Sequence, residues 1–129
     1  MDNLYIPPTP SSPEVDFKFD ENTLSLRGES YPENAAAFYG DILRQLQAYL
    51  GARSGQKIQV SIALAYFNSS STKMLFNLVG LLSDAAEAGN EVVLNWFHDE
   101  EDDTIFEFGQ ELKDDFTAIQ FVNHAVKSA

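Results

Sequence analysis

The sequence predicts a two-layer α/β domain, in which a mixed sheet of four to five strands carries about three helices, mainly on one face. Several short segments alternate apolar with polar or small residues, and three longer ones repeat apolar residues every three or four positions. Because the short segments alternate instead of being apolar throughout, we expect the second face of the sheet to lack helices. A chain of 129 residues, 44% of them hydrophobic, predicts a single domain over residues 1–129.

The N-terminal part predicts an extended arm followed by a β-hairpin. Residues 1–13 are interrupted too often by proline to sustain a helix, so we expect a Pro-rich arm. Alternation over residues 15–19 and 23–27, with Asp20-Glu21-Asn22 between them, is typical of two antiparallel strands.

The first helix is expected to begin near Pro32 and to end before Gly51. Pro32 suits a first helical turn, and Glu33 suits the positive end of the helix dipole. The inward stripe is predicted to be Ala35, Phe38, Ile42, Leu46 and Tyr49.

The rest of the chain predicts alternating strands and helices. Residues 57–67 and 92–97 have the period of strands, and a helix over about 70–88 separates them, so the two strands should be parallel. A third amphipathic helix is expected near residues 105–116, and residues 118–122 predict a short last strand.

Charge and composition exclude several kinds of partner. A net charge of −12 repels phosphate backbones, so we expect no nucleic acid partner. No apolar run reaches the length of a membrane span and the first residues do not form a signal peptide, so no membrane association and a cytoplasmic location are expected. The chain has no cysteine, which excludes disulfides, thiolate metal sites and a cysteine nucleophile.

The residues that could support catalysis or metal binding form no recognisable site. The acidic run of residues 99–103 lacks the spacing and central glycine of a calcium loop, and its better explanation is a solvated start of the third helix. His98 is expected to end a strand and His124 to lie in a frayed tail. We therefore expect neither an enzyme nor a metal or other cofactor.

The segment from Tyr66 to Lys73 is the best candidate for a functional site, because it joins the end of the central strand to the second helix. One of its hydroxyls is expected to cap that helix. The same position stabilises an added phosphate through free N–H groups and the helix dipole. The candidate acceptors are Ser69, with Ser70, Ser71 and Thr72 as alternatives.

Several motifs of the chain resemble those of the SiaC-type bacterial regulatory phosphoproteins. These are Ser30-Tyr31-Pro32-Glu33-Asn34 followed by Phe38-Tyr39, then Tyr66-Phe67-Asn68-Ser69-Ser70-Ser71 with Lys73, and then Trp96 ahead of the acidic run. The likeness extends from Ile6, through Thr9-Pro10, to Phe121.

This resemblance implies a STAS-like fold, related to anti-anti-sigma factors, and partner switching by a Ser/Thr protein kinase and a PP2C-type phosphatase. It implies that the residue after the asparagine, here Ser69, is the phosphoacceptor. The unphosphorylated form is then expected to bind an output protein, a diguanylate cyclase in cyclic-di-GMP and biofilm signalling. We expect partners to contact the residues around this switch, namely Tyr66, Asn68, Ser70, Lys73, Tyr31, Glu33 and Asn34.

Two other functions remain open on the sequence. An anti-anti-sigma factor acting on an anti-sigma kinase belongs to the same class of regulator. A small-ligand or metal sensor would use the strand-end loop and the acidic run.

Overall fold

The computed structural model describes residues 1–127, which form one six-stranded sheet and three α-helices. The strands lie in the order of the sequence: β1 (Leu4–Ile6), β2 (Glu14–Lys18), β3 (Thr23–Ser30), β4 (Lys57–Phe67), β5 (Glu91–Asp99) and β6 (Gln120–Val126). The helices are α1 (Ala35–Gly51), α2 (Ser69–Glu87) and α3 (Asp103–Asp115), and a short 3-10 turn spans Phe19–Glu21.

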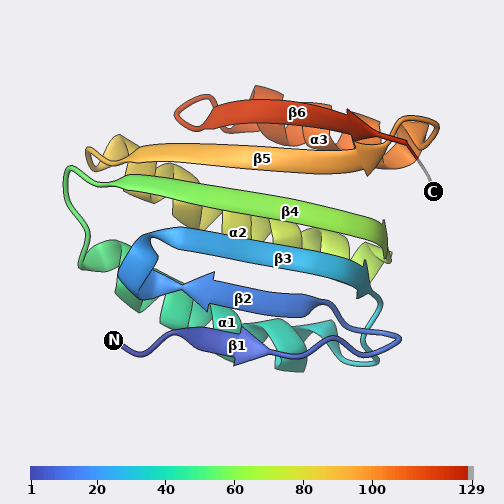
Figure 1. Cartoon of the computed structure of the whole chain (residues 1–129), viewed down its shortest axis with the longest axis horizontal. Helices are drawn as coiled ribbons and strands as arrows, with labels where there is room; N and C mark the ends of the chain where they lie inside the picture. The colour runs from blue at the N-terminus through green and yellow to red at the C-terminus, as the bar shows by residue number, and fades with distance from the viewer. Residues whose placement is uncertain (128–129) are drawn as a thin grey trace.

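The sheet is mixed and has helices on one face. The strands β1, β2 and β3 pair antiparallel, whereas β3, β4, β5 and β6 are parallel. Each parallel pair is joined by one helix, and each step moves the chain one strand in the same direction. Crossovers of one hand then place all three helices on the same side, as Figure 1 shows. The predicted two-layer fold is confirmed, with six strands instead of four or five.

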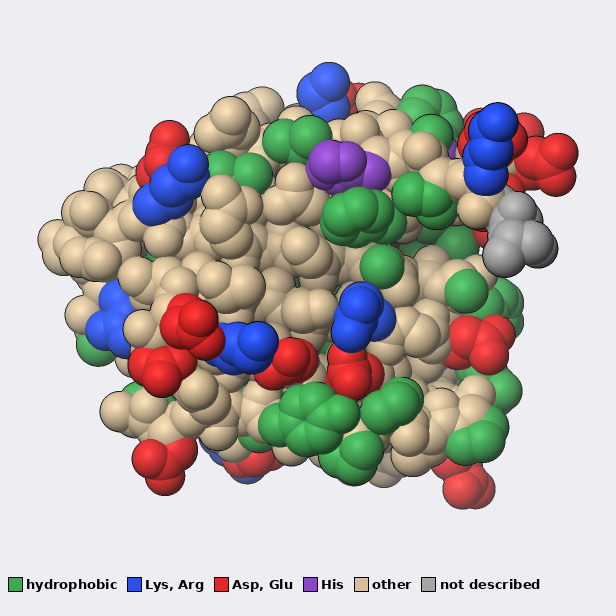
Figure 2. Space-filling model, in the orientation of Figure 1, with side chains coloured by type: hydrophobic (Ala, Val, Ile, Leu, Met, Phe, Trp, Pro, Cys, Tyr) green, Lys and Arg blue, Asp and Glu red, His purple; other side chains and the backbone are tan. Residues whose placement is uncertain are grey.

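The alternation along β4 shows why one face is covered. Ile58, Val60, Ile62 and Leu64 are at most 3% exposed and face the helices. The residues between them, from Gln59 to Ala65, are partly or fully exposed. The opposite face therefore stays in contact with solvent, and Figure 2 shows acidic and basic side chains interspersed over it.

The N-terminal arm contributes more structure than its prolines predicted. Leu4–Ile6 forms β1, an edge strand that pairs antiparallel with β2. The predicted hairpin is confirmed, since Val15 lies opposite Leu26 and Phe17 opposite Leu24.

The start of α1 lies later than predicted. Its N-cap is Asn34, whose side-chain oxygen accepts a hydrogen bond from the Ala37 N–H at 3.0 Å. Pro32 and Glu33 therefore form the turn before the helix. Ala35, Ile42, Leu46 and Tyr49 are buried as predicted, but Phe38 is only half-buried. Tyr39, which the predicted stripe omitted, is completely buried, because its hydroxyl finds a buried partner in Ser30.

The C-terminal strand is longer than predicted and changes the place of His124. β6 pairs with β5 as far as Val126, so His124 belongs to the sheet and the prediction of a frayed tail is wrong. Its ring stacks on Phe97 with centroids 4.5 Å apart, and its Nε2 lies 2.9 Å from Asn95 Oδ1. A pairing made with a strand distant in sequence cannot be read from the composition of the tail.

A close contact between Trp96 and α3 fixes the third helix on the sheet. Trp96 is 1% exposed, and its indole N–H donates to the Ile105 carbonyl at 3.1 Å. Gly109 lies directly over the ring: a Cβ at this position would be 2.5 Å from two indole atoms. Only a residue without a side chain lets α3 approach this closely.

We expect Gly109→Ala to destabilise the fold by about 1–3 kcal/mol, because the added methyl overlaps the indole and forces α3 away. Urea unfolding followed by circular dichroism measures this effect. Gly40→Ala is the matched control, since a Cβ at Gly40 meets no atom within 4 Å and alanine favours a helix. Equal stability of Gly109→Ala and the wild type would contradict the packing described.

Candidate functional site

The candidate switch lies where β4 ends and α2 begins, beside the end of β3. The backbone N–H of Asn68 donates to the Ser30 carbonyl at 3.0 Å, which continues the pairing of the two parallel strands by one residue. The loop between β4 and α2 is therefore a single residue long. Its position follows directly from the central pair of parallel strands.

The cap of α2 is Asn68 and not a hydroxyl, contrary to the sequence expectation. The Asn68 side-chain oxygen accepts from the Ser71 N–H at 3.0 Å. Its backbone carbonyl accepts from the N–H and the hydroxyl of Thr72, at 3.0 and 3.1 Å. With the cap supplied by asparagine, the hydroxyls of Ser69 and Ser70 are not needed for it.

The four hydroxyl residues of this segment differ in accessibility. Ser69 and Ser70 are exposed, Thr72 is half-buried and Ser71 is completely buried. Because a kinase must reach the hydroxyl it modifies, this arrangement favours Ser69 and Ser70 over the other two.

A buried chain of hydroxyls holds the first turn of α2 in place. The Ser30 hydroxyl donates to Ser71 Oγ at 2.8 Å, which leaves Tyr39 to donate its phenolic hydrogen to Ser30 Oγ at 2.6 Å. All three residues are 0% exposed. Burial raises the pKa of Tyr39 to about 12, and the hydrogen bond with Ser30 only partly offsets it. This chain links α1, β3 and α2 directly beneath the candidate switch.

The residues predicted around the switch do lie together. Glu33, Asn34, Ser69, Ser70 and Lys73 line one hollow of about 420 Å³ between the N-termini of α1 and α2. The backbone N–H groups and the positive dipole ends of both helices lie at this hollow, together with the Lys73 ammonium. The Glu33 carboxylate is the acidic group that lines it.

An exposed aromatic pair lies at the same end of the sheet. Tyr31 follows β3 and Tyr66 is near the end of β4, and their rings meet edge to face with centroids 5.8 Å apart. They remain 39% and 49% exposed. Tyrosines that are rigid and exposed are common anchors in protein interfaces.

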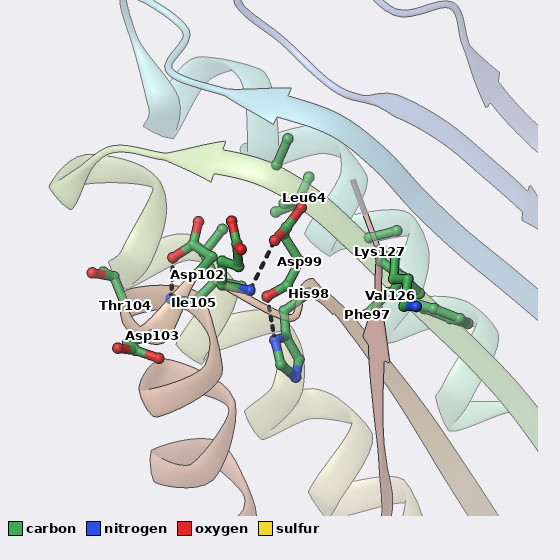
Figure 3. Close-up of a pocket in the computed structure, with 13 residues that line it drawn as sticks. Leu64, Phe97, His98, Asp99, Asp102, Asp103, Thr104, Ile105, Val126 and Lys127 are labelled. Atoms are coloured by element: carbon green, nitrogen blue, oxygen red, sulfur yellow. Dashed lines mark hydrogen bonds between the residues drawn. The ribbon is translucent and has the colours of Figure 1, made fainter. Parts of the chain in front are cut away.

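The acidic run borders a separate hollow of about 820 Å³ at the ends of β4, β5 and β6 (Figure 3). Asp102 caps α3, because its side chain accepts from the Ile105 N–H at 3.1 Å, and Asp99 accepts from the Glu101 N–H at 2.8 Å. This arrangement agrees with the expected role at the start of the third helix. Within residues 1–127, no group of three or more acidic or histidine side chains is placed to hold a metal ion.

His98 lies beside this second hollow as the penultimate residue of β5. Its Nδ1 lies 2.8 Å from the Asp99 carbonyl and its Nε2 lies 3.1 Å from Asn123 Nδ2. An imidazole that donates from Nδ1 and accepts at Nε2 satisfies both contacts.

Within the described residues 1–127, no helix is long and apolar enough to cross a bilayer.

Comparison with known proteins identifies the family. The model of the SiaC family of regulatory phosphoproteins matches residues 6–126. The chain belongs to the SiaC family. An uncharacterised protein of Pseudomonas aeruginosa (strain UCBPP-PA14) is 31% identical over 116 residues, which cover 89% of this chain and 90% of that protein.

Two solved structures show the same architecture. The crystal structure of apo-SiaC from Pseudomonas aeruginosa is similar with a TM-score of 0.88 and 29% identity, over 97% of this chain and 100% of that one. The SiaC fold also matches in a crystal structure of the diguanylate cyclase SiaD in complex with its activator SiaC, from the same organism. There the TM-score is 0.87 and the identity 29%, over 95% and 99% of the two chains. The resemblance found in the sequence motifs is thus confirmed.

The raised pKa of Tyr39 predicts a loss of stability at high pH. The unfolded chain releases the Tyr39 proton near pH 10 and the folded chain near pH 12, so the free energy of unfolding should fall as pH rises through this window. The slope from this residue is about 1.4 kcal/mol per pH unit at most. Urea titrations from pH 8 to 11.5 measure it.

Tyr39→Phe should make that fall shallower while lowering stability at pH 8 by about 1 kcal/mol, through the lost hydrogen bond to Ser30. Tyr66→Phe, which removes an exposed hydroxyl, is the control and should follow the wild type. If Tyr39→Phe retained the full slope, the buried hydroxyl chain would not account for it.

Proposed function

We propose that this protein, in its unphosphorylated form, binds and activates a diguanylate cyclase, and that phosphorylation of Ser69 prevents this binding. The observation that carries the proposal is the similarity to SiaC in the complex where SiaC is the activator of SiaD, which spans 95% of this chain. It favours a cyclase as the output protein over the sigma-factor system. The second messenger cyclic-di-GMP then links the protein to biofilm control.

The position of Ser69 supports its role as the acceptor. It is the first residue of α2, directly after the cap Asn68, and its side chain is exposed. The N–H groups of Ser69 and Ser70, which the Asn68 cap does not use, and the helix dipole favour a phosphate at such a position. Lys73 follows four residues later on the same face of the helix and is the nearest cation in the sequence.

A phosphate on Ser69 would change the docking surface through charge. It adds nearly two negative charges at pH 7 to a hollow that already contains the Glu33 carboxylate. A partner that covers this hollow and the Tyr31–Tyr66 pair would have to desolvate those charges. The proposed partner surface therefore consists of the residues around Ser69 at this end of the sheet: Tyr31, Glu33, Asn34, Tyr66, Asn68, Ser70 and Lys73.

We further propose that a Ser/Thr kinase adds this phosphate and a PP2C-type phosphatase removes it, while the protein itself acts by binding and not by catalysis. The contacts of the histidines support the second point. Both nitrogens of His98 are engaged with Asp99 and Asn123, and His124 is held by Asn95. Neither ring lies beside a serine or threonine hydroxyl in any contact of the described residues.

Mass spectrometry tests the modification. We expect protein purified from its own host to carry one phosphate on Ser69, which treatment with a PP2C-type phosphatase removes. Ser69→Ala should lack this phosphate and Ser70→Ala should retain it. A phosphate mapped to Ser70, or its persistence in Ser69→Ala, would contradict the assignment of the acceptor without affecting the choice of partner.

A coupled assay tests the partner. With a purified diguanylate cyclase from the same genome, the wild type and Ser69→Ala should raise the rate of cyclic-di-GMP formation. Ser69→Asp should need at least about tenfold more protein for the same effect, since tenfold corresponds to 1.4 kcal/mol of binding. The matched control is Ser54→Asp, which adds the same charge at an exposed serine in the turn before β4, outside this hollow, and should activate like the wild type. Equal activation by Ser69→Asp and Ser69→Ala would contradict the charge switch, and no activation by any form would contradict the cyclase as partner.

A further inference from the structure

The two edges of the sheet are protected very differently. β1 is three residues long and is followed at once by Pro7 and Pro8, which cannot donate to another strand. β6, at the other edge, is seven residues long and contains neither proline nor a charged residue, in a chain with 22% charged residues. Long and neutral edges are the kind that pair with another strand.

The backbone of β6 presents a regular row of unsatisfied groups along this edge. The Val126 carbonyl accepts from the Glu100 N–H at 2.8 Å, so Val126 directs its polar groups toward the β5 side. Because successive residues of a strand alternate, Phe121, Asn123 and Ala125 direct their N–H and C=O groups outward. Three donors and three acceptors thus face away from the sheet.

Side chains hold β6 firmly without covering that edge. Asn123 donates to His98 Nε2 at 3.1 Å on the helical side, and His124 stacks on Phe97 on the open side. Both contacts point back to β5. The strand is therefore ordered in advance, so pairing with it costs little additional ordering.

An exposed aromatic side chain of α3 lies beside the β6 edge, in the helical layer. Phe106 of α3 is 37% exposed, and its ring lies 5.2 Å from that of His98. His98 is bonded to Asn123, so Phe106 lies on the β6 side of α3. Gln110, one turn later, is on the same side of the helix. Phe106 and Gln110 thus add one apolar and one neutral polar side chain to the surface beside β6.

We propose that a second copy of this chain pairs antiparallel with β6, about a two-fold axis near Asn123, so that two sheets join into one. In this register Phe121 lies opposite Ala125 of the partner copy, and Val122 lies opposite its His124. Along the paired strands no like charges meet, which favours self-pairing in a chain with a net charge of −12.

The antiparallel direction also separates the strongest charges. The acidic run of residues 99–103 lies at one end of β6, because Glu100 bonds to Val126. Two-fold pairing places the acidic runs of the two copies at opposite ends of the joined edge, about 23 Å apart for seven residues at roughly 3.3 Å each. At physiological salt the screening length is about 8 Å, so this repulsion is small.

The neutral edge favours an identical copy over a basic partner. A basic partner strand, rich in Lys and Arg, would need carboxylates along the edge to pair with, and β6 has none. The pairing is independent of the proposed switch, because Ser69 follows β4 and β4 is separated from β6 by β5. Both switch surfaces of such a dimer stay open to the cyclase.

Sedimentation velocity from about 1 to 500 µM tests the pairing. The wild type should shift from monomer to dimer with rising concentration, more strongly at 300 than at 50 mM NaCl because salt screens the repulsion between two acidic chains. Ala125→Pro removes one outward N–H and spares the bonds to β5, so it should stay monomeric. The control Ala125→Thr keeps the N–H and should dimerise. The proposal is overturned if the wild type stays monomeric at all concentrations, in which case the edge would be left for a strand of another protein. It is also overturned if Ala125→Pro dimerises as strongly as the wild type.

Cross-linking gives a second readout that does not depend on proline being tolerated. The chain has no cysteine, so Asn123→Cys carries a single thiol. Residues opposite each other in a hydrogen-bonded antiparallel pair have Cα atoms about 5.5 Å apart, which a disulfide can span. Asn123→Cys should form a disulfide-linked dimer under mild oxidation, whereas Ser54→Cys, in the turn before β4, should not. Equal cross-linking of both variants, or of neither, contradicts the two-fold axis near Asn123.

Discussion

The hydrogen-bonded chain from Tyr39 through Ser30 to Ser71 connects three elements at one point. Ser30 ends β3, Tyr39 lies in the second turn of α1, and Ser71 lies in the first turn of α2. These hydroxyls are completely buried, so each depends on the others for a partner. Removing one leaves a polar group unsatisfied in the core, at a cost of about 1–3 kcal/mol. The position of α2, whose first turn carries the candidate phosphoacceptors, depends on this contact.

The same contact explains how a rigid support can carry an accessible hydroxyl. Ser71 faces the core, and Asn68 satisfies its N–H, so the helix start is held from within. Ser69 and Ser70 are exposed to solvent, and their hydroxyls take no part in the cap. A modification at Ser69 can alter the surface without disturbing the fold, which suits a regulator that must remain folded in both states.

One-sided coverage of the sheet divides the surface by function. The helices bury one face, and the carboxyl ends of the parallel strands hold the candidate switch, the aromatic pair Tyr31 and Tyr66, and the acidic hollow. The lateral edge at β6 is neutral and is separated from β4 and the candidate switch by β5, although its end at Val126 borders the acidic hollow. The proposed regulation by phosphate and the proposed pairing with a second copy therefore use separate parts of one small domain.

Much of the fold was predictable because periodicity is a local property. The alternation over residues 57–67 matched β4 residue for residue, and the helix expected over about 70–88 is α2, Ser69–Glu87. The helix boundaries were predicted less accurately. Pro32 can begin a helix, yet α1 begins later, because Asn34 caps it by accepting from the N–H of Ala37, three residues on. His124 carried no local signal for β6, since its partners Phe97 and Asn95 come from another strand.

The sequence by itself determined the three helices, the strands other than β1, the coverage of one face of the sheet, and the family, through patterns and motifs that are read along the chain. Only the tertiary structure decided which hydroxyl is buried, because Ser71 meets Ser30 across 41 residues of sequence. It also brought Glu33 and Asn34 beside Ser69 and Lys73. Burial and bonding between distant segments arise when elements pack, and no local pattern encodes them.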